Sequence, residues 1–170
     1  SNGDLFVSGG ETYVSGPVSS ANGAIDYAGS AKITGGIFIA VGAGGMAQNF
    51  GSDSTQGSMM VNTSSARSGE EIVLKNSSGE TVLAYTPEKS YSSAVISCPE
   101  IKQGETYTVI IGDYSTSVKM TDIIYGGQGG MGGFGGQGGM GGFGGHGGFG
   151  GENSQNGVPG GGHGGFGGKR

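Results

Sequence analysis

The ionisable residues in the first third of this chain are few and scattered. Between residues 1 and 56 they are Asp4, Glu11, Asp26, Lys32 and Asp53. General acid–base catalysis needs an acid and a base that both reach the reacting atoms of one substrate. No two of these residues occupy positions that stacked strands would bring together. We therefore expect no enzymatic activity and assign no catalytic residue.

Oxygen-bearing side chains near turns are the candidate metal ligands. Calcium binds several oxygens from carboxylates, amides and backbone carbonyls. Asn22, Asp26 and Asp53 could contribute such oxygens, which makes calcium a candidate cofactor. The alternative role for each of the three is an Asx turn, in which the side chain bonds nearby backbone.

Tyrosine rings suggest a different kind of site. An exposed aromatic face can stack on a sugar ring, and Tyr13 and Tyr27 are the candidate glycan-binding residues in the first third of the chain. The alternative for both is ordinary packing, with the ring half-buried and the hydroxyl hydrogen-bonded.

Charge and hydropathy exclude two classes of partner. The formal net charge is −5, and the lysines stand singly along the chain. Nucleic acid binding needs several basic groups on one surface, so we expect none. The chain has no apolar run of about 18 residues, so we also expect no membrane insertion. Cys98 is the only cysteine, and we expect a buried apolar side chain, with an intermolecular disulfide as the alternative.

Residues 1–56 contain an internal repeat with a spacing of 26 residues. The glycines at 3, 9, 10 and 16 recur at 29, 35, 36 and 42. This spacing suits one coil of a parallel β-helix, made of short strands and turns. Leu5 and Val7 would stack over Ala31 and Ile33 and point inward, and Phe6 would point outward. The register places residue 1 in mid-coil. We therefore expect an open end, left either by missing upstream coils or for a strand from another molecule.

Residues 57–125 show a different pattern. Short strands alternate with turn signals, and we predict a set of antiparallel hairpins that covers the end of the β-helix. The predicted strands are Ser58–Asn62, Glu71–Leu74, Thr81–Tyr85, Ser93–Ser97, Thr106–Ile111 and Ser117–Met120.

Residues 126–170 form a glycine-rich tail. They hold 26 of the 43 glycines, and residues 126–151 repeat Gly-Gly-X. In an extended polyglycine II-like helix of three residues per turn, every X side chain lies on one edge. We predict that this edge mediates assembly; the alternative is a flexible linker. The predicted assembly residues are Met131, Phe134, Met140, Phe143 and Phe149.

Several motifs resemble the end of a known family. They are Tyr13–Pro17, Asn22–Tyr27, Thr34–Gly36, Gly45–Asn49, Pro87–Tyr91 and Gly104–Thr108, followed by the Gly- and Met-rich tail. Together they resemble the C-terminal part of secreted bacterial carbohydrate-binding domain-containing proteins. The resemblance implies a parallel β-helix with bound calcium, binding to cellulose or pectin-like polysaccharide, and a cell-surface location. Acidic turns of upstream coils in that family have no counterpart here.

We therefore expect an all-β chain in three parts. Residues 1–56 form the last coils of a right-handed parallel β-helix, residues 57–125 an antiparallel cap, and residues 126–170 the extended tail. The expected function is non-catalytic polysaccharide binding outside the cell. The alternative is a structural subunit of an extracellular filament, a homo-oligomer assembled by coil stacking or strand donation and by packing of the tails.

Overall fold

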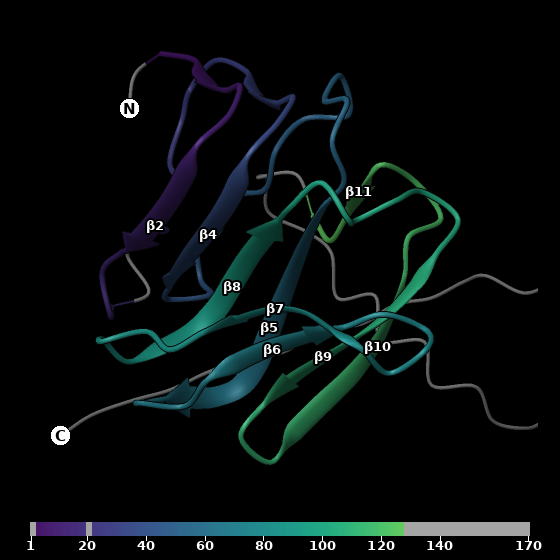
Figure 1. Ribbon diagram of the computed structural model, residues 1–170. Coiled ribbons are helices and arrows are strands. Elements are labelled where there is room, and N and C mark those ends of the chain that lie inside the picture. Colours follow the sequence, from purple (N-terminus) through teal and green to yellow (C-terminus); the bar gives the residue numbers. More distant parts are fainter. Residues whose placement is uncertain (1–2, 20–21, 128–170) are drawn as a thin grey trace, which may run out of the picture. The chain divides into compact units, whose positions relative to one another are not determined.

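The computed structural model describes residues 3–19 and 22–127 (Figure 1). These residues form eleven strands in three sheets and contain no helix, which confirms the predicted all-β class. The strands are β1 (Leu5–Val7), β2 (Glu11–Ser15), β3 (Ala31–Ile33), β4 (Ile37–Gly42), β5 (Ser58–Arg67), β6 (Ile72–Lys75), β7 (Thr81–Tyr85), β8 (Tyr91–Ser97), β9 (Thr106–Ile111), β10 (Tyr114–Lys119) and β11 (Ile124–Tyr125).

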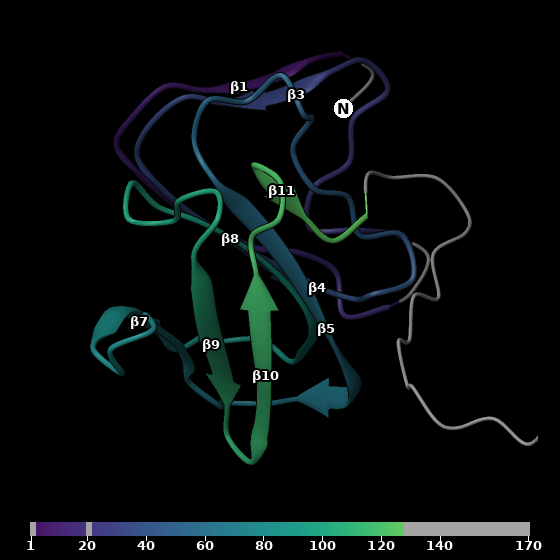
Figure 2. The ribbon, with the colours of Figure 1, turned by 90° about the vertical axis from the view of Figure 1, so that its right-hand side faces the viewer.

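Two parallel strand pairs reproduce the predicted 26-residue register. β1 pairs with β3 so that Leu5 faces Ala31, and β2 pairs with β4 so that Val14 faces Ala40. Figure 2 shows β1 beside β3. Phe6 points outward and is 66% exposed, as strand alternation predicts. We call residues 4–16 the first layer and residues 30–42 the second layer.

The parallel pairing ends after these two layers, which corrects the expected architecture. The far neighbour of β4 is β8, which runs antiparallel to it, and β8 in turn pairs antiparallel with β5. β11 then pairs with β5 in parallel. The described residues therefore form mixed sheets, without a parallel β-helix closed by a separate antiparallel cap.

The physical reason is that β8 is apolar on both faces. Ala94 and Ile96 contribute to one buried cluster and Val95 to the other, so β8 suits the middle of a sheet that is covered on both sides. In the sheet order β11-β5-β8-β4-β2, it occupies the place beside β4 where another coil would lie.

The three sheets stack as layers around the five-stranded one. One face of this sheet packs on β1 and β3 through Ile33, Phe38 and Val95. The opposite face packs on the sheet β10-β9-β6-β7 through Ile39, Leu74 and Val109. Hairpins β6–β7 and β9–β10 form the four-stranded sheet, as antiparallel pairing of these segments predicts. Cys98 is 1% exposed and belongs to the apolar cluster between the five-stranded and the four-stranded sheets. Burial there raises the pKa of its thiol to about 12.

Buried polar side chains join the parallel layers to the mixed sheet. The Gln56 amide donates to Gly36 O and to Ser97 Oγ, each at 2.8 Å. Ser97 Oγ donates in turn to Gly57 O at 2.6 Å. Asn49 Oδ1 accepts from Ser58 Oγ at 2.7 Å. These bonds satisfy backbone and side-chain groups that lie out of reach of water, where an unpaired group costs about 1–3 kcal/mol.

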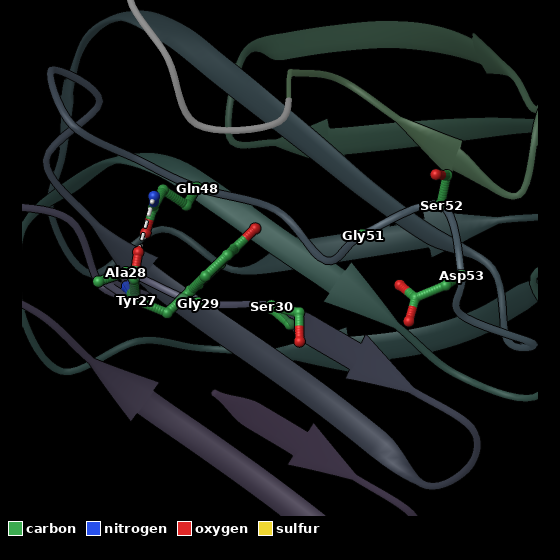
Figure 3. A pocket seen from close by; sticks show the side chains of 9 residues that line it. Tyr27, Ala28, Gly29, Ser30, Gln48, Gly51, Ser52 and Asp53 are labelled. Atoms are coloured by element: carbon green, nitrogen blue, oxygen red, sulfur yellow. Dashed lines mark hydrogen bonds between the residues drawn. The ribbon is translucent and has the colours of Figure 1, made fainter. Parts of the chain in front are cut away.

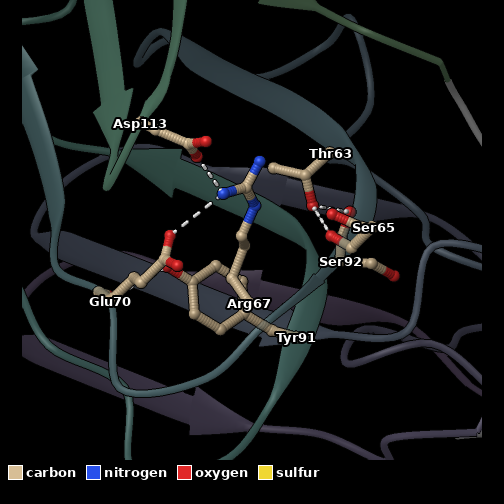
Figure 4. A network of polar contacts seen from close by, with 7 residues as sticks. All are labelled: Thr63, Ser65, Arg67, Glu70, Tyr91, Ser92 and Asp113. Atoms are coloured by element: carbon tan, nitrogen blue, oxygen red, sulfur yellow. Dashed lines mark hydrogen bonds and ion pairs between the residues drawn. The ribbon is translucent and has the colours of Figure 1, made fainter.

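An ionic cluster ties the end of β5 to the β9–β10 turn (Figure 4). The Arg67 guanidinium lies between Glu70, at 3.3 Å, and Asp113. The hydroxyl of Tyr91 donates to Glu70 O at 2.8 Å. Arg67 lowers the pKa of the Asp113 carboxyl, first by a hydrogen bond and then by its charge. We interpret this cluster as structural, because each charge has a partner within the fold.

The two glycines Gly36 and Gly79 provide a test of layer stacking. Both have positive φ, 95° and 82°. A Cβ on Gly36 would lie 2.6 Å from Gly10 O in the first layer, whereas one on Gly79 would have no atom within 4 Å. We expect Gly79→Ala to cost about 1–2 kcal/mol of unfolding free energy from backbone strain alone. Gly36→Ala should cost about 1–3 kcal/mol more, because the layers must separate. Urea unfolding of both variants measures the difference, and equal losses would contradict tight stacking.

The Asp113–Arg67 pair predicts a pH dependence of stability. The folded pKa of Asp113 is lower than its unfolded value, so the pair stabilises the fold above the unfolded pKa of about 3.9. This contribution is lost as the pH falls through the folded pKa. Asp113→Asn should therefore be less stable than the parent chain at neutral pH, and the difference should vanish in strong acid. Urea unfolding at neutral pH and in strong acid measures this difference. Asp122→Asn, at an exposed aspartate, is the control.

Candidate functional site

A polar hollow of about 510 Å³ opens between two loops. One loop precedes β3 and supplies Tyr27, Gly29 and Ser30, and the other connects β4 to β5 and supplies Gln48, Ser52 and Asp53 (Figure 3). The second loop is held against β3 because Gly51 N donates to Ala31 O at 2.6 Å and Thr55 N to Ile33 O at 3.1 Å. The second loop thus runs along β3 without forming a strand.

Tyr27 is fixed in this hollow at both its backbone and its hydroxyl. Gln48 Oε1 accepts from Tyr27 N at 2.8 Å, and Gln48 Nε2 donates to Tyr27 O at 3.4 Å. The Tyr27 hydroxyl donates to Asn49 O at 2.6 Å. Asn49 is itself fully buried, and its amide donates to Tyr125 O at 2.9 Å. The ring is therefore held in place before any ligand arrives.

The electrostatics of the hollow depend on one carboxylate. Burial, and then the charge of Asp53, raise the pKa of Tyr27, so its hydroxyl stays a neutral donor. Asp53 Oδ2 lies 4.0 Å from Lys32 Nζ, and both side chains are partly exposed. Such a pair contributes little to stability, which leaves the Asp53 carboxylate available to a ligand.

The lining suits hydrogen bonding to a hydroxyl-rich ligand. It combines the hydroxyls of Ser30 and Ser52, the carboxylate of Asp53 and the half-buried ring of Tyr27. Polar groups around an aromatic ring are typical of sites that orient a small polar molecule.

The three predicted metal ligands do not share one site. Asp53 lines the polar hollow, whereas Asp26 lines a second hollow beside Asp4 and Leu5, and Asn22 lines neither. Asn22 and Asp26 are both exposed. In the part of the chain that the structure describes, no group of three or more His, Cys, Asp and Glu side chains could hold a metal ion.

The two predicted glycan-binding tyrosines lie in different surroundings. Tyr13, on β2, is 46% exposed and stacks on Tyr85 of β7, with ring centroids 4.8 Å apart and planes at 22°. Its hydroxyl donates to Glu11 at 3.3 Å. Tyr27 alone of the two lines the polar hollow. The predicted assembly residues Met131, Phe134, Met140, Phe143 and Phe149 lie outside the described residues.

Gln48 and Asn49 are site residues that the sequence patterns did not indicate. They contact Tyr27 across 21 and 22 residues, a shorter interval than the 26-residue repeat. The signal that points to them is the Gly45–Asn49 motif, which stood out by resemblance and without an assigned role. Stacking this motif on Asn22–Tyr27 at a shortened interval would have placed the amides beside Tyr27.

Comparison with protein-family models, curated proteins and solved structures found no match. Among the described residues there is also no helix long and apolar enough to cross a membrane.

Tyr27→Phe tests whether the hydrogen bond from the Tyr27 hydroxyl to Asn49 O holds the ring in place. Removing the hydroxyl leaves Asn49 O without its donor, so we expect a loss of about 0.5–1.5 kcal/mol in unfolding free energy. Tyr13→Phe is the matched control, because the hydroxyl of Tyr13 bonds an exposed carboxylate and its loss should cost much less. Thermal and urea unfolding measure both, and equal losses would show that Tyr27 is not held as described.

Proposed function

We propose that this protein binds polysaccharide without cleaving it, at the polar hollow around Tyr27. The single observation that supports this function is a ring fixed in advance beside hydroxyl, amide and carboxylate groups. A fixed ring loses little conformational entropy when a ligand stacks on or beside it, which favours binding. The resemblance to secreted carbohydrate-binding proteins supports the same proposal and adds an extracellular or cell-surface location.

The charge of the hollow favours a neutral chain over an acidic one. Asp53 faces the solvent with 58% of its side chain exposed, and the chain as a whole has a net charge of −5. A uronate carboxylate brought to this hollow would meet Asp53, whose charge the partly exposed Lys32 offsets only in part, and it would be repelled unless a further cation lay between the two carboxylates. We therefore propose a cellulose-like glucan as the main ligand, and calcium as a cofactor for pectin-like chains.

Asp53→Ala combined with Ser52→Ala tests the proposal. Both side chains are exposed, so the fold should persist while two ligand contacts are lost. We expect retention on insoluble cellulose to weaken about five- to tenfold, the equivalent of about 1 kcal/mol or slightly more. Asp122→Ala, at an exposed aspartate that does not line the polar hollow, is the matched control and should bind like the parent chain.

A chelator separates the two classes of polysaccharide. Binding to cellulose should survive chelation, and any binding to polygalacturonate should depend on added calcium. Unchanged binding of the double variant to both polysaccharides would refute the polar hollow as the site.

A filament subunit is the second proposed function, and the open edge of β2 supports it. β2 is an edge strand of the five-stranded sheet, and β1 is an edge strand of the two-stranded sheet, where it pairs with β3. We propose that the two layers are coils of a right-handed parallel β-helix that continues across this edge in an assembly. Electron microscopy of the full chain should show regular filaments; isolated particles alone would contradict this function.

A further inference from the structure

The outward face of β1 and β3 carries one exposed aromatic ring. Phe6 is 66% exposed, the highest value for a large apolar side chain among the described residues. Leu5 and Val7 pack on the cluster beneath these strands, so Phe6 between them points outward. Side chains stand roughly perpendicular to a sheet, so a strand beside β1 would lie next to this ring and not over it. A ligand that covered the ring would remove apolar surface from water, which favours binding.

The ring stands at one end of a row of three side chains. Lys32 faces Phe6 in the register of β1 and β3, and Lys32 Nζ lies 4.0 Å from Asp53 Oδ2. The loop that carries Asp53 follows β3 through two backbone hydrogen bonds, so the three segments lie side by side. Neighbouring strands are about 4.8 Å apart, so the row spans about 10 Å from Phe6 to Asp53. We call Phe6, Lys32 and Asp53 the platform row.

Short hydroxyl side chains flank the platform row. The exposed ones on β3, its two flanking positions and the neighbouring loop are Ser30, Thr34, Ser52 and Thr55. Between Asp53 and Thr55, Ser54 is buried, and its Oγ accepts from Ile33 N at 3.1 Å. The loop therefore alternates inward and outward side chains as a strand does, and it extends the outward face of β1 and β3 by a third segment.

This face suits the two kinds of surface on a sugar. A pyranose ring presents C–H groups on its faces and hydroxyls around its rim. A C–H face can cover Phe6, while rim hydroxyls bond to Lys32 and Asp53, whose side chains are 35% and 58% exposed. A protein partner would need more apolar surface than one ring, because specific protein interfaces bury about 1,200–2,000 Å² around an apolar centre.

The platform row is continuous with the polar hollow around Tyr27. Asp53 belongs to the row and also lines the hollow, together with Ser30 and Ser52 (Figure 3). Phe6 lies two strand spacings from Asp53, about 10 Å, which is close to the length of one disaccharide unit of cellulose. A glucan chain in the hollow that continues across β3 would therefore bring a later sugar over Phe6.

We propose that Phe6 is the stacking residue of a second sugar subsite, reached by a polysaccharide that lies in the polar hollow and crosses β3 along the platform row. This inference rests on the proposed polysaccharide binding, and it adds the direction of the bound chain and the residue at its far end. It also makes affinity depend on chain length, because a short oligosaccharide fills the hollow without reaching Phe6.

Phe6→Ala tests the subsite through chain length. In NMR titrations of the full chain, the variant should bind cellohexaose about three- to tenfold more weakly than the parent chain, the usual value of one aromatic contact. Cellobiose should bind both equally. Met46→Ala, at a residue 58% exposed in another loop, is the matched control and should bind like the parent chain. Equal binding of cellohexaose to Phe6→Ala and the parent chain would overturn the subsite, and so would an equal loss with both sugars.

Phe6→Trp reads out the stacking directly. The chain contains no Trp, so this variant carries a single fluorescent indole. Cellohexaose should shift its emission to shorter wavelength and protect it from acrylamide, because a sugar replaces water over the ring. Met46→Trp should show neither change. Unchanged Phe6→Trp emission with cellohexaose bound would overturn the subsite alone.

The same reporter separates the subsite from the hollow. Adding Ser52→Ala and Asp53→Ala to Phe6→Trp should move the cellohexaose titration to about five- to tenfold higher concentration, if one chain occupies both places. An unmoved titration would refute the continuous path. Absence of any cellohexaose binding by the parent chain would refute polysaccharide binding itself, and the subsite with it.

Discussion

The architecture depends on how buried polar groups are satisfied where parallel layers meet antiparallel strands. At this junction, Gln56 bridges Gly36 of the second layer and Ser97 of β8, and Asn49 links Ser58 to the backbone of β11. A repeated coil would satisfy its backbone with the next identical coil. Here the chain leaves the repeat, and amide and hydroxyl side chains replace the missing partners. Asn49, one of these residues, also accepts the hydrogen bond of the Tyr27 hydroxyl, so the position of the Tyr27 ring depends on the same junction.

Local pattern predicted the strands better than their partners. β7 and β9 begin and end at the predicted residues, and both parallel pairs have the predicted spacing. The strand bounds and the spacing of the pairs depend on alternation of apolar side chains and on turn residues, which act over a few positions. The insertion of β8 beside β4 was not foreseen. An apolar run such as Ala94–Ile96 shows that a strand is covered on both faces, but it does not specify its neighbours. The Tyr27 site was missed in part because its loops stack at a shortened interval.

The polar hollow and the open edge place two kinds of contact on different residues of one scaffold. The hollow is formed by loops, which carry little of the core and can vary in composition. The edge is formed by the first layer, whose inward side chains repeat the pattern of the layer beneath it. Tyr13 belongs to the edge and Tyr27 to the hollow, so two residues expected to share one role lie at separate surfaces.

The position of β8 also sets an order on folding. The inner edge of β4 pairs with a strand that begins at Tyr91, about 50 residues later in the chain. On the ribosome, the two layers would therefore emerge with an unpaired row of backbone N–H and C=O groups along β4 before β8 is made. Contacts of such long sequence separation form slowly, since a long loop must close first. The first two layers are synthesised before β8 and completed only after it, and during this interval the free edge of β4 can pair with a strand of another chain.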